Sequence, residues 1–239
     1  MKNIIDEITA LLKSQADPKV AANYEQYFKK VIRFHGLKTP EIRNLFSEYY
    51  SKSIKTMPFD EQIELAYRLF ESKYAEEKSF GIGILKKNLK KLDHSHIKDF
   101  EPIIDKHIYD WGTSDSLSGK IISRMIEAHP EYGKLLIPWK DAKCLWRQRS
   151  ACVSFVNVAR FGKHNDTIIK IGSACVKNPE RFVQLGLGWM LRELSLADLD
   201  LTIKFIKANY RHFSREGLRY AIEKMEPDLR QEMLAFKLR

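Results

Sequence analysis

Apolar residues recur along most of the chain at the three- and four-residue spacing of amphipathic helices. The first segment shows the pattern clearly, because five apolar residues form one stripe between charged ones: Ile4, Ile5, Ile8, Leu11 and Leu12. Almost no segment shows the period-two alternation that is typical of a half-buried strand. The pattern therefore predicts an all-α fold.

Helix starts recur at a nearly constant interval. Thr39-Pro40-Glu41 combines a capping residue, a first-turn proline and an acid near the positive end of the helix dipole. Similar starts follow at intervals of 34 to 37 residues, near Glu76, Trp111, Leu145, Glu180 and Ser214. Each interval holds a second apolar-periodic segment, at residues 58–71, 94–108, 130–137, 164–176 and 197–208. A period near 35 without the tetratricopeptide pattern predicts stacked helical hairpins of the HEAT kind.

This repeat pattern predicts a single HEAT-like repeat domain over residues 1–239. An N-terminal helical cap of two extra helices would cover about residues 1–36, the second helix running from Pro18 to Phe34. About six hairpins would follow over residues 38–239 and wind into a right-handed α-solenoid with a concave, basic face. If the first helix of each hairpin lies on the inner side, the inner row holds these residues: Arg43, Lys78, Trp111, Asp115, Arg149, Trp189, Arg192, Arg215 and Arg219.

The chain carries an excess of positive charge. The 41 Lys and Arg residues against 31 Asp and Glu residues give a net charge of +10 with the histidines neutral. Such an excess favours polyanionic partners, nucleic acid ahead of membrane. A basic concave face would follow a duplex backbone through its phosphates, with salt-sensitive and sequence-independent affinity. Because no zinc-finger, RRM or homeodomain signature accompanies the charge, we do not expect sequence-specific reading.

Targeting signals are missing from the sequence. The first segment is unlike a signal peptide because acids interrupt its apolar stretch. No run of about 18 uncharged apolar residues occurs, so we expect no membrane span. Cys144, Cys152 and Cys175 cannot all pair within one chain, which favours a reducing compartment. We expect a monomeric, cytoplasmic protein of the bacterial cytosol that associates with the nucleoid when it binds DNA.

Motifs for metals and nucleotides are also missing. No cysteine or histidine shows zinc-ligand spacing, and no His-Glu-x-x-His pattern occurs. Gly81-Ile-Gly83 and Gly186-Leu-Gly188 lack the third glycine and the preceding strand of a dinucleotide fingerprint. We expect no metal, no nucleotide and no other cofactor.

Two residues of one segment could carry chemistry. Trp111 and Asp115 are four positions apart and therefore lie on one helix face, and the small residues Gly-Thr-Ser between them would leave the surrounding space open. Asp115 has an alternative role as a first-turn acid that favours the helix dipole. Arg149 of the next repeat has an alternative role as an ion-pair partner of Asp115.

The remaining tryptophans differ in their surroundings. Trp189 follows Gly186 and Gly188 inside a helical segment, where each glycine costs roughly 1 kcal/mol against alanine. Glycine at these positions indicates close approach by another backbone or by a ligand, although core packing explains Trp111 and Trp189 equally well. Trp139 and Trp146 are expected to pack in the core.

Several short motifs follow one another along the chain: the segment around Tyr27, Gly36-Leu-Lys-Thr39-Pro40-Glu41, Trp111-x-x-x-Asp115, Leu145-Trp146-Arg147-Gln148-Arg149, Gly188-Trp189-Met-Leu-Arg192-Glu193 and Ser214-Arg215-Glu216. In this order and spacing the chain resembles, over nearly its whole length, the AlkD-like family of bacterial DNA glycosylases. Members of that family are built from HEAT-like repeats and excise alkylated purines. This chain has Gly-Thr-Ser between Trp111 and Asp115, where members often carry a second aromatic residue and another acid.

The resemblance implies roles for individual residues. In that family a tryptophan and an aspartate on one inner helix, an arginine on the next and a tryptophan on the one after form the active cleft. The resemblance thus implies that Asp115, Trp111 and Trp189 are catalytic. Together with the basic inner row, it indicates these DNA-binding residues: Arg149, Tyr27, Arg43, Arg192, Arg215 and Arg219. The implied substrates are cationic 3-methyl- and 7-methylpurines in double-stranded DNA, released without a base-flipping pocket.

Three functions follow from these observations. The first is a monofunctional DNA glycosylase that hydrolyses the N-glycosidic bond of cationic alkylated purines. The second is a non-catalytic binder of damaged or branched DNA. The third is a HEAT-repeat scaffold for a protein partner. The presence of both tryptophans, the aspartate and the arginine favours the enzyme.

Overall fold

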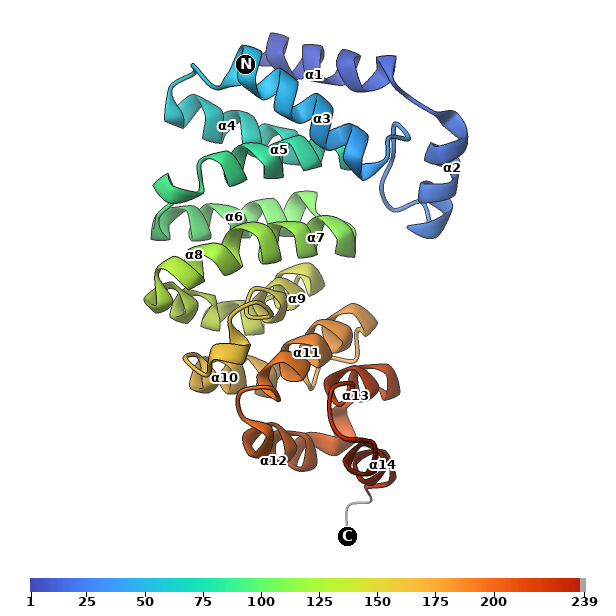
Figure 1. Ribbon diagram of the computed structural model, residues 1–239, viewed down its shortest axis with the longest axis vertical. Coiled ribbons are helices and arrows are strands. Elements are labelled where there is room, and N and C mark those ends of the chain that lie inside the picture. The colour runs from blue at the N-terminus through green and yellow to red at the C-terminus, as the bar shows by residue number, and fades with distance from the viewer. Residues whose placement is uncertain (237–239) are drawn as a thin grey trace. The chain divides into compact units, whose positions relative to one another are not determined.

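The computed structural model describes residues 1–236, and within them the chain is helical and forms no strand (Figure 1). The chain divides into two compact units, Met1–Ser116 and Leu117–Arg239. The all-α class predicted from the apolar pattern is confirmed. The single domain over residues 1–239 stays a prediction.

In the N-terminal unit most helices stack against one another, whereas α2 lies to one side of the stack (Figure 1). Helix α5 is the centre, because α1, α3 and α4 all contact it, and α4 also contacts α6. Large apolar side chains such as Phe70, Phe80 and Phe100 fill the space between these helices. The helices are α1 (Lys2–Ser14), α2 (Pro18–Tyr27), α3 (Thr39–Tyr49), α4 (Phe59–Phe70), α5 (Ala75–Lys87), α6 (His94–His107) and α7 (Trp111–Leu117), whose last residue belongs to the second unit.

In the C-terminal unit, helix α11 is the centre of the packing. It contacts α9, α10, α12 and α13, and Leu187, Met190 and Leu191 are buried along it. A π-helical turn (Ser118–Ile122) leads into α8, and a 3-10 helix (Pro130–Asp141) leads toward α9. The helices are α8 (Ser123–Ala128), α9 (Leu145–Val153), α10 (Asn165–Cys175), α11 (Arg181–Leu194), α12 (Leu199–Asn209), α13 (Arg215–Ala221) and α14 (Pro227–Ala235).

The predicted repeat interval is confirmed. Helices α3, α5, α7, α9, α11 and α13 begin within one residue of the six expected starts. Four of the five second segments are α-helices. The segment expected at 130–137 is instead a 3-10 helix, and Pro130 and Pro138 explain the difference because proline has no N–H to donate to an α-helical ladder. The right-handed winding and the concave basic face stay predictions.

The predicted helix from Pro18 to Phe34 is too long. Helix α2 is capped by Asp17, whose carboxylate accepts from Lys19 N and Val20 N, and it ends at Tyr27. Lys29 and Lys30 then adopt φ values of 52° and 60°, in the left-handed region, which ends an α-helix.

The segment after these two lysines is held in an extended form by α5. The carboxylate of Glu76 accepts hydrogen bonds from the backbone N–H groups of His35, Gly36 and Leu37. Gly36 itself has φ of +100°, and a Cβ there would collide with the carbonyl oxygen of Asp17. Residues 35–37 therefore satisfy their N–H groups on α5 and not in a longer α2.

Helices α11 and α13 pack backbone against backbone. A Cβ on Gly188 would lie 2.5 Å from the carbonyl oxygen of Gly217, and a Cβ on Gly217 would lie 2.9 Å from that of Gln184. The buried Gln184 side chain joins the same region, because its Nε2 donates to Val176 O and its Oε1 accepts from Ser214 N. Close approach by another backbone, one of the two explanations expected for Gly188, is the one that the structure shows.

Candidate functional site

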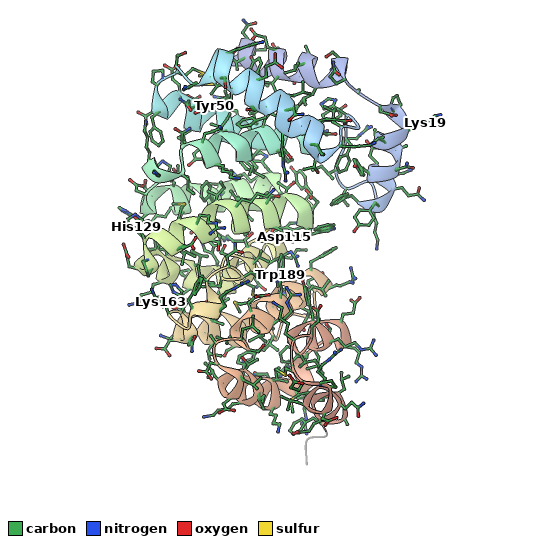
Figure 2. All side chains as sticks on the ribbon, in the orientation of Figure 1. Lys19, Tyr50, Asp115, His129, Lys163 and Trp189 are labelled. Carbon is green, nitrogen blue, oxygen red and sulfur yellow. The ribbon has the colours of Figure 1, made fainter. Side chains whose placement is uncertain are left out.

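Trp111 and Asp115 lie on α7 and are both half-buried, and Figure 2 labels Asp115. The start of this helix is fixed by Asp110, whose Oδ1 accepts from Thr113 N at 2.8 Å and whose carbonyl accepts from Ser114 N at 3.2 Å. Asp115 is the fifth residue of α7, and the first turn contains no acid. The alternative in which Asp115 is a first-turn acid is therefore wrong, since Asp110 has the capping role.

Aromatic rings from the end of α2 pack against Trp111. Phe28 stacks on the indole with ring centroids 5.1 Å apart and planes 19° apart, and Tyr27 meets it edge-on at 6.1 Å. Tyr27 is 68% exposed. A Cβ on Gly112 would lie 3.3 Å from Phe28 Cζ. Phe28 thus fills part of the room that Gly112 leaves, and a cavity lined by Gly112, Thr113 and Ser116 supplies the open space that the small residues predict.

The two other inner-row residues expected in this unit differ in exposure. Arg43 is exposed on α3. Lys78 is fully buried, and its ammonium donates to the carbonyl oxygens of Phe70 and His107 at two helix ends. Burial lowers the pKa of Lys78 to about 8. The structure therefore contradicts an exposed position for Lys78 and gives it a structural role.

In the C-terminal unit, Arg149 lies on α9 beneath α11. It is only 5% exposed, and its Nη1 donates to the carbonyl oxygen of Phe182 at 2.6 Å. A Cβ on Gly186 would lie 3.1 Å from Arg149 Cγ. Gly186 therefore makes room for the aliphatic part of the Arg149 side chain. The sequence had indicated that another backbone or a ligand approaches this glycine. The DNA contact expected of Arg149 stays a prediction.

Trp189 lies on α11, is half-buried, and has a ring and a cation close to it (Figure 2). Tyr220 stacks on it at 6.2 Å with an interplanar angle of 19°, and the Arg192 guanidinium lies 6.0 Å from its ring and 4.9 Å from that of Tyr220. The indole Nε1 is buried and donates to no group among the described residues. Trp189 is neither fully in the core nor fully exposed.

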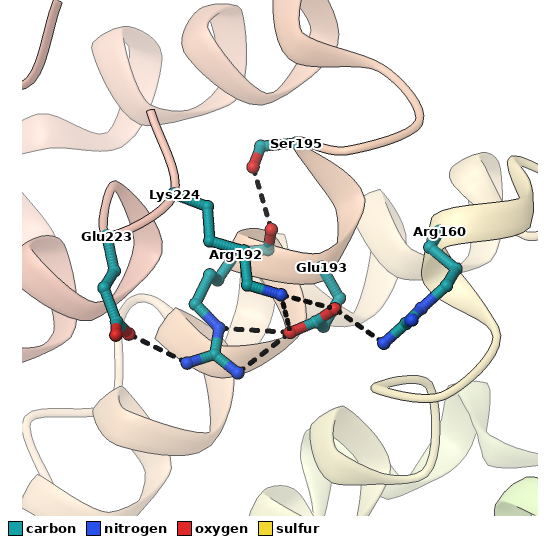
Figure 3. Close-up of polar contacts among 6 residues, drawn as sticks. All are labelled: Arg160, Arg192, Glu193, Ser195, Glu223 and Lys224. Carbon is teal, nitrogen blue, oxygen red and sulfur yellow. Dashed lines mark hydrogen bonds and ion pairs between the residues drawn. The ribbon is translucent and has the colours of Figure 1, made fainter. Parts of the chain in front are cut away.

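A buried carboxylate holds three cations beside Trp189 (Figure 3). Glu193 is 2% exposed and accepts from Arg192 at 2.9 and 3.1 Å, from Lys224 at 3.0 and 3.2 Å and from Arg160 at 3.0 Å. Glu223 accepts a hydrogen bond from Nη1 of Arg192 at 2.8 Å. Burial would raise the pKa of Glu193, but hydrogen bonds from Lys224 and Arg192 outweigh it and hold that pKa below its usual range.

Sequence reasoning missed the role of Glu193. Its cations come from the same helix, from the segment before α10 and from the segment between α13 and α14, so no local spacing indicates that they converge. The one signal in the sequence is Glu193 itself, an acid that directly follows Arg192 within a mostly apolar helical segment.

The remaining expected DNA contacts of this unit differ in exposure. Arg215 and Arg219 lie on the surface of α13, and Arg215 also donates to Leu234 O at 3.4 Å. Arg192, in contrast, is half-buried in the Glu193 cluster. Of the two core tryptophans, Trp139 is buried as predicted, whereas Trp146 is half-buried and tilts against Phe182 at 5.2 Å.

No helix within residues 1–236 combines the length and apolar character needed to cross a membrane. Across the same residues, no cluster of three or more His, Cys, Asp or Glu side chains could hold a metal ion.

Helical hairpins at a 35-residue period, with arginines exposed on the first helix of a pair, define a helical-repeat protein. The chain matches the family model of the DNA alkylation repair enzymes over residues 8–225, and it belongs to that family. A solved structure of a predicted DNA alkylation repair enzyme from Enterococcus faecalis has a similar fold, with a TM-score of 0.80 at 18% identity. The match covers 89% of this chain and 97% of that one. A search of curated proteins gives no match.

The family resemblance inferred from short motifs is thereby confirmed. Membership supports a role in the repair of alkylated DNA. The roles of individual residues stay predictions.

Proposed function

We propose that this protein is a monofunctional DNA glycosylase that hydrolyses the N-glycosidic bond of cationic alkylated purines in duplex DNA, such as 3-methyladenine and 7-methylguanine. The observation that carries the proposal is Asp115, a half-buried carboxylate one helical turn from Trp111. Since Asp110 caps α7, the helix start does not account for Asp115. Membership of the repair family supplies the class of substrate.

The chemistry needs a carboxylate and no acid. N-alkylation places a positive charge on the purine, so the bond between C1′ and the base nitrogen breaks with its electron pair going to the base. The base leaves neutral, and positive charge develops on the sugar. Asp115 stabilises that charge and orients a water molecule, whose oxygen bonds to C1′ and whose proton passes to the carboxylate or to solvent.

The tryptophans assist the same charge development. An indole face against the deoxyribose attracts a growing positive charge by about 0.5–2 kcal/mol. Trp111 is held for this by Phe28 and Tyr27, and Trp189 by Tyr220 and Arg192. The reaction needs no cofactor and no pocket for a flipped base.

The arginines bind phosphate. Arg43, Arg215 and Arg219 are exposed and can neutralise a DNA backbone directly. Hydrogen bonds to the protein fix the positions of Arg149 and Arg192. Fixed guanidinium groups can orient a DNA strand as well as attract its phosphates. Tyr27 places an exposed ring beside Trp111, where it can contact the sugar-phosphate chain.

A single-turnover assay tests this function. Methylated duplex DNA is incubated with excess protein, and released 3-methyladenine and 7-methylguanine are quantified over time. The matched control is Asp60→Asn, which removes an exposed first-turn acid of α4 in the same unit. Release by wild type and by the control, but not by Asp115→Asn, is the expected result. Duplex binding without any release would contradict the proposal and favour a non-catalytic binder of damaged or branched DNA.

A further inference from the structure

Exposed lysines gather where α5 ends. Two of them belong to the last turn of α5, and two belong to the 3-10 turn Leu89–Lys91 that follows it. Another comes directly after the π-helical turn Tyr50–Ile54, and its backbone N–H donates to Tyr50 O at 2.8 Å. We call this group the lysine patch: Lys55, Lys86, Lys87, Lys90 and Lys91.

Buried hydrogen bonds fix the surface that carries the patch. Asn88 lies between the two pairs of lysines, is buried, and donates from Nδ2 to Gln62 Oε1 on α4 at 2.8 Å. The Tyr50 hydroxyl donates to the same Gln62 oxygen at 3.1 Å. The end of α5 is therefore tied to α4 and to the π-helical turn, so the lysines project from a fixed base.

Two lysines of the patch also lie over aromatic rings. Lys87 Nζ is 5.5 Å from the ring centroid of Tyr50, and Lys91 Nζ is 5.5 Å from that of Phe59, the first residue of α4. A ring attracts a cation but carries no net charge. These contacts hold the ammonium groups at the surface and leave their charge available.

The charge of the patch is not neutralised by the protein. Within residues 1–236 no member of the patch forms an ion pair, whereas the neighbouring Lys52 pairs with Glu48 at 2.6 Å. Asp93, the next acid along the chain, accepts instead from Ser95 and His96. The dipole of α5 favours only the lysines in its last turn. Because close like charges repel, a concentration of unpaired lysines indicates a polyanionic partner.

The surroundings of the patch decide between classes of polyanion. The large apolar side chains that are exposed among the described residues all lie outside it: Tyr27, Val31, Tyr109, Phe161, Leu196 and Leu199. Protein and membrane interfaces use apolar or aromatic anchors. The phosphates of a nucleic acid need only cations. The patch therefore fits a DNA backbone, and membership of the repair family points to the same polyanion.

The patch and the candidate active site lie toward opposite ends of α5. The cavity beside Gly112, Thr113 and Ser116 reaches α5 near its start, at Ala75 and Glu76. From Ala75 to Lys87 the helix rises about 18 Å, at 1.5 Å per residue. In Figure 2, Tyr50, whose ring lies under Lys87, is labelled well away from Asp115. The patch is thus a surface of its own.

We propose that the lysine patch is a second DNA-binding surface, which holds the phosphate backbone of another duplex while the candidate active site engages its own. Contact through phosphates carries no sequence information, so this binding is non-specific. The proposal rests on the proposed function only in taking DNA as the partner, because neither Trp111 nor Asp115 belongs to the patch. Two surfaces on one molecule would let the protein pass between neighbouring DNA segments without full release.

Energy transfer between two short undamaged duplexes, one with a donor dye and one with an acceptor dye, tests the proposal. Wild-type protein should bring the two duplexes together. The variant K86Q/K87Q/K90Q/K91Q should need about tenfold more protein for the same transfer, because phosphate contacts are lost. The variant K86R/K87R/K90R/K91R retains the charge and should bridge the duplexes as wild type does. No transfer with wild type, or undiminished transfer with the folded glutamine variant, would overturn the proposal.

A matched control removes the same charge from scattered positions. The variant K2Q/K19Q/K134Q/K170Q changes exposed lysines of both units and should bridge the duplexes as wild type does. An equal loss in this control would show that net charge, and not the patch, is responsible. Patch-dependent binding to phosphatidylglycerol–phosphatidylcholine vesicles or to polyglutamate, without bridging of duplexes, would overturn DNA as the partner.

A parallel assay separates this inference from the proposed function. Single-turnover release of 7-methylguanine should be the same in wild type and in K86Q/K87Q/K90Q/K91Q, since the patch does not touch the candidate active site. Release without bridging would overturn the second surface alone. Bridging without release would overturn the glycosylase alone.

Discussion

Trp111, in the N-terminal unit, packs against the rings of Phe28 and Tyr27, whereas Trp189, in the C-terminal unit, packs against the ring of Tyr220 and has the guanidinium of Arg192 nearby. The first indole packs against aromatic rings. The second is linked through Arg192 to Glu193 and so to two further cations, Arg160 and Lys224 (Figure 3). Two tryptophans to which sequence reasoning gave the same role therefore depend on different forces, and different perturbations should affect them.

The largest effect is expected at Asp115, beside the aromatic group. Asp115→Asn keeps the shape of the side chain but loses the negative charge that stabilises the developing sugar cation. Single-turnover release of 7-methylguanine should fall about 100-fold, which is a loss of roughly 2.7 kcal/mol of transition-state stabilisation.

Two controls belong to that measurement. Affinity for undamaged duplex should stay constant or rise, because a repulsion with phosphate is removed, and the melting temperature should be close to that of wild type. An unchanged release rate in the folded variant would remove Asp115 from the mechanism.

The next effect concerns the charged group around Trp189. Glu193→Gln should lower the free energy of unfolding at pH 7 by about 1–3 kcal/mol, less than for a fully buried pair because Arg160 and Lys224 are partly exposed. Urea unfolding of wild type and variant measures this difference in the free energy of unfolding. Glu216→Gln, which removes the exposed ion pair with Arg181, is the matched control and should have little effect.

The same variant has a pH signature. The pKa of Glu193 is lower in the folded state than in the unfolded state. The charge of Glu193 therefore contributes fully to the free energy of unfolding above the unfolded-state pKa, near 4.3, and this contribution is lost as pH falls through the lower folded-state pKa. The difference in stability between wild type and Glu193→Gln should therefore narrow as pH falls below about 4. A difference that stays constant from pH 7 to pH 3 would show that the charge of Glu193 contributes nothing.

A smaller effect separates the two indoles directly. Phe28→Leu removes the stack on Trp111 and should lower the rate of base release about tenfold, within the 0.5–1.5 kcal/mol that an aromatic pair contributes. Tyr220→Leu removes the matching stack on Trp189 but leaves Arg192 bound to Glu193 and Glu223, so the rate should fall by less. Equal losses in the two variants would mean that the ion network does not position Trp189.

The smallest effect is on non-specific affinity. Arg219→Gln removes one exposed cation from α13 and should reduce the slope of log affinity against log salt concentration by about 0.9. Filter binding to undamaged duplex at several salt concentrations measures it. A slope equal to that of wild type would remove Arg219 from the DNA contact.

The repeat pattern was predictable because helix starts and apolar stripes are local. Thr39-Pro40-Glu41 and its successors carry their own capping and dipole signals, so α3, α5, α7, α9, α11 and α13 begin where expected. The end of α2 was not predictable in this way. It depends on Glu76, which binds the backbone of residues 35–37 from about 40 positions further along the chain, and on two left-handed lysines that have no local signature.

The candidate site was predictable only in part, for the same reason. The spacing of Trp111 and Asp115 places them on one face of α7, but Phe28, which fills part of the space beside them, comes from another element. The Glu193 cluster brings together residues that are 31 to 33 positions apart, slightly less than one repeat interval. Contacts across a repeat interval follow from the stacking of hairpins and not from any short motif.

Gly36 has a consequence for mutational tolerance. Every substitution at this codon adds a Cβ, which would collide with the Asp17 carbonyl and force a side chain into φ of +100°. Residues 35–37 would then lose their register on Glu76, and Phe34 and Phe28 would move with them. A saturation-mutagenesis screen for resistance to alkylating agents should therefore score position 36 among the intolerant sites, on grounds of backbone geometry rather than contact with DNA.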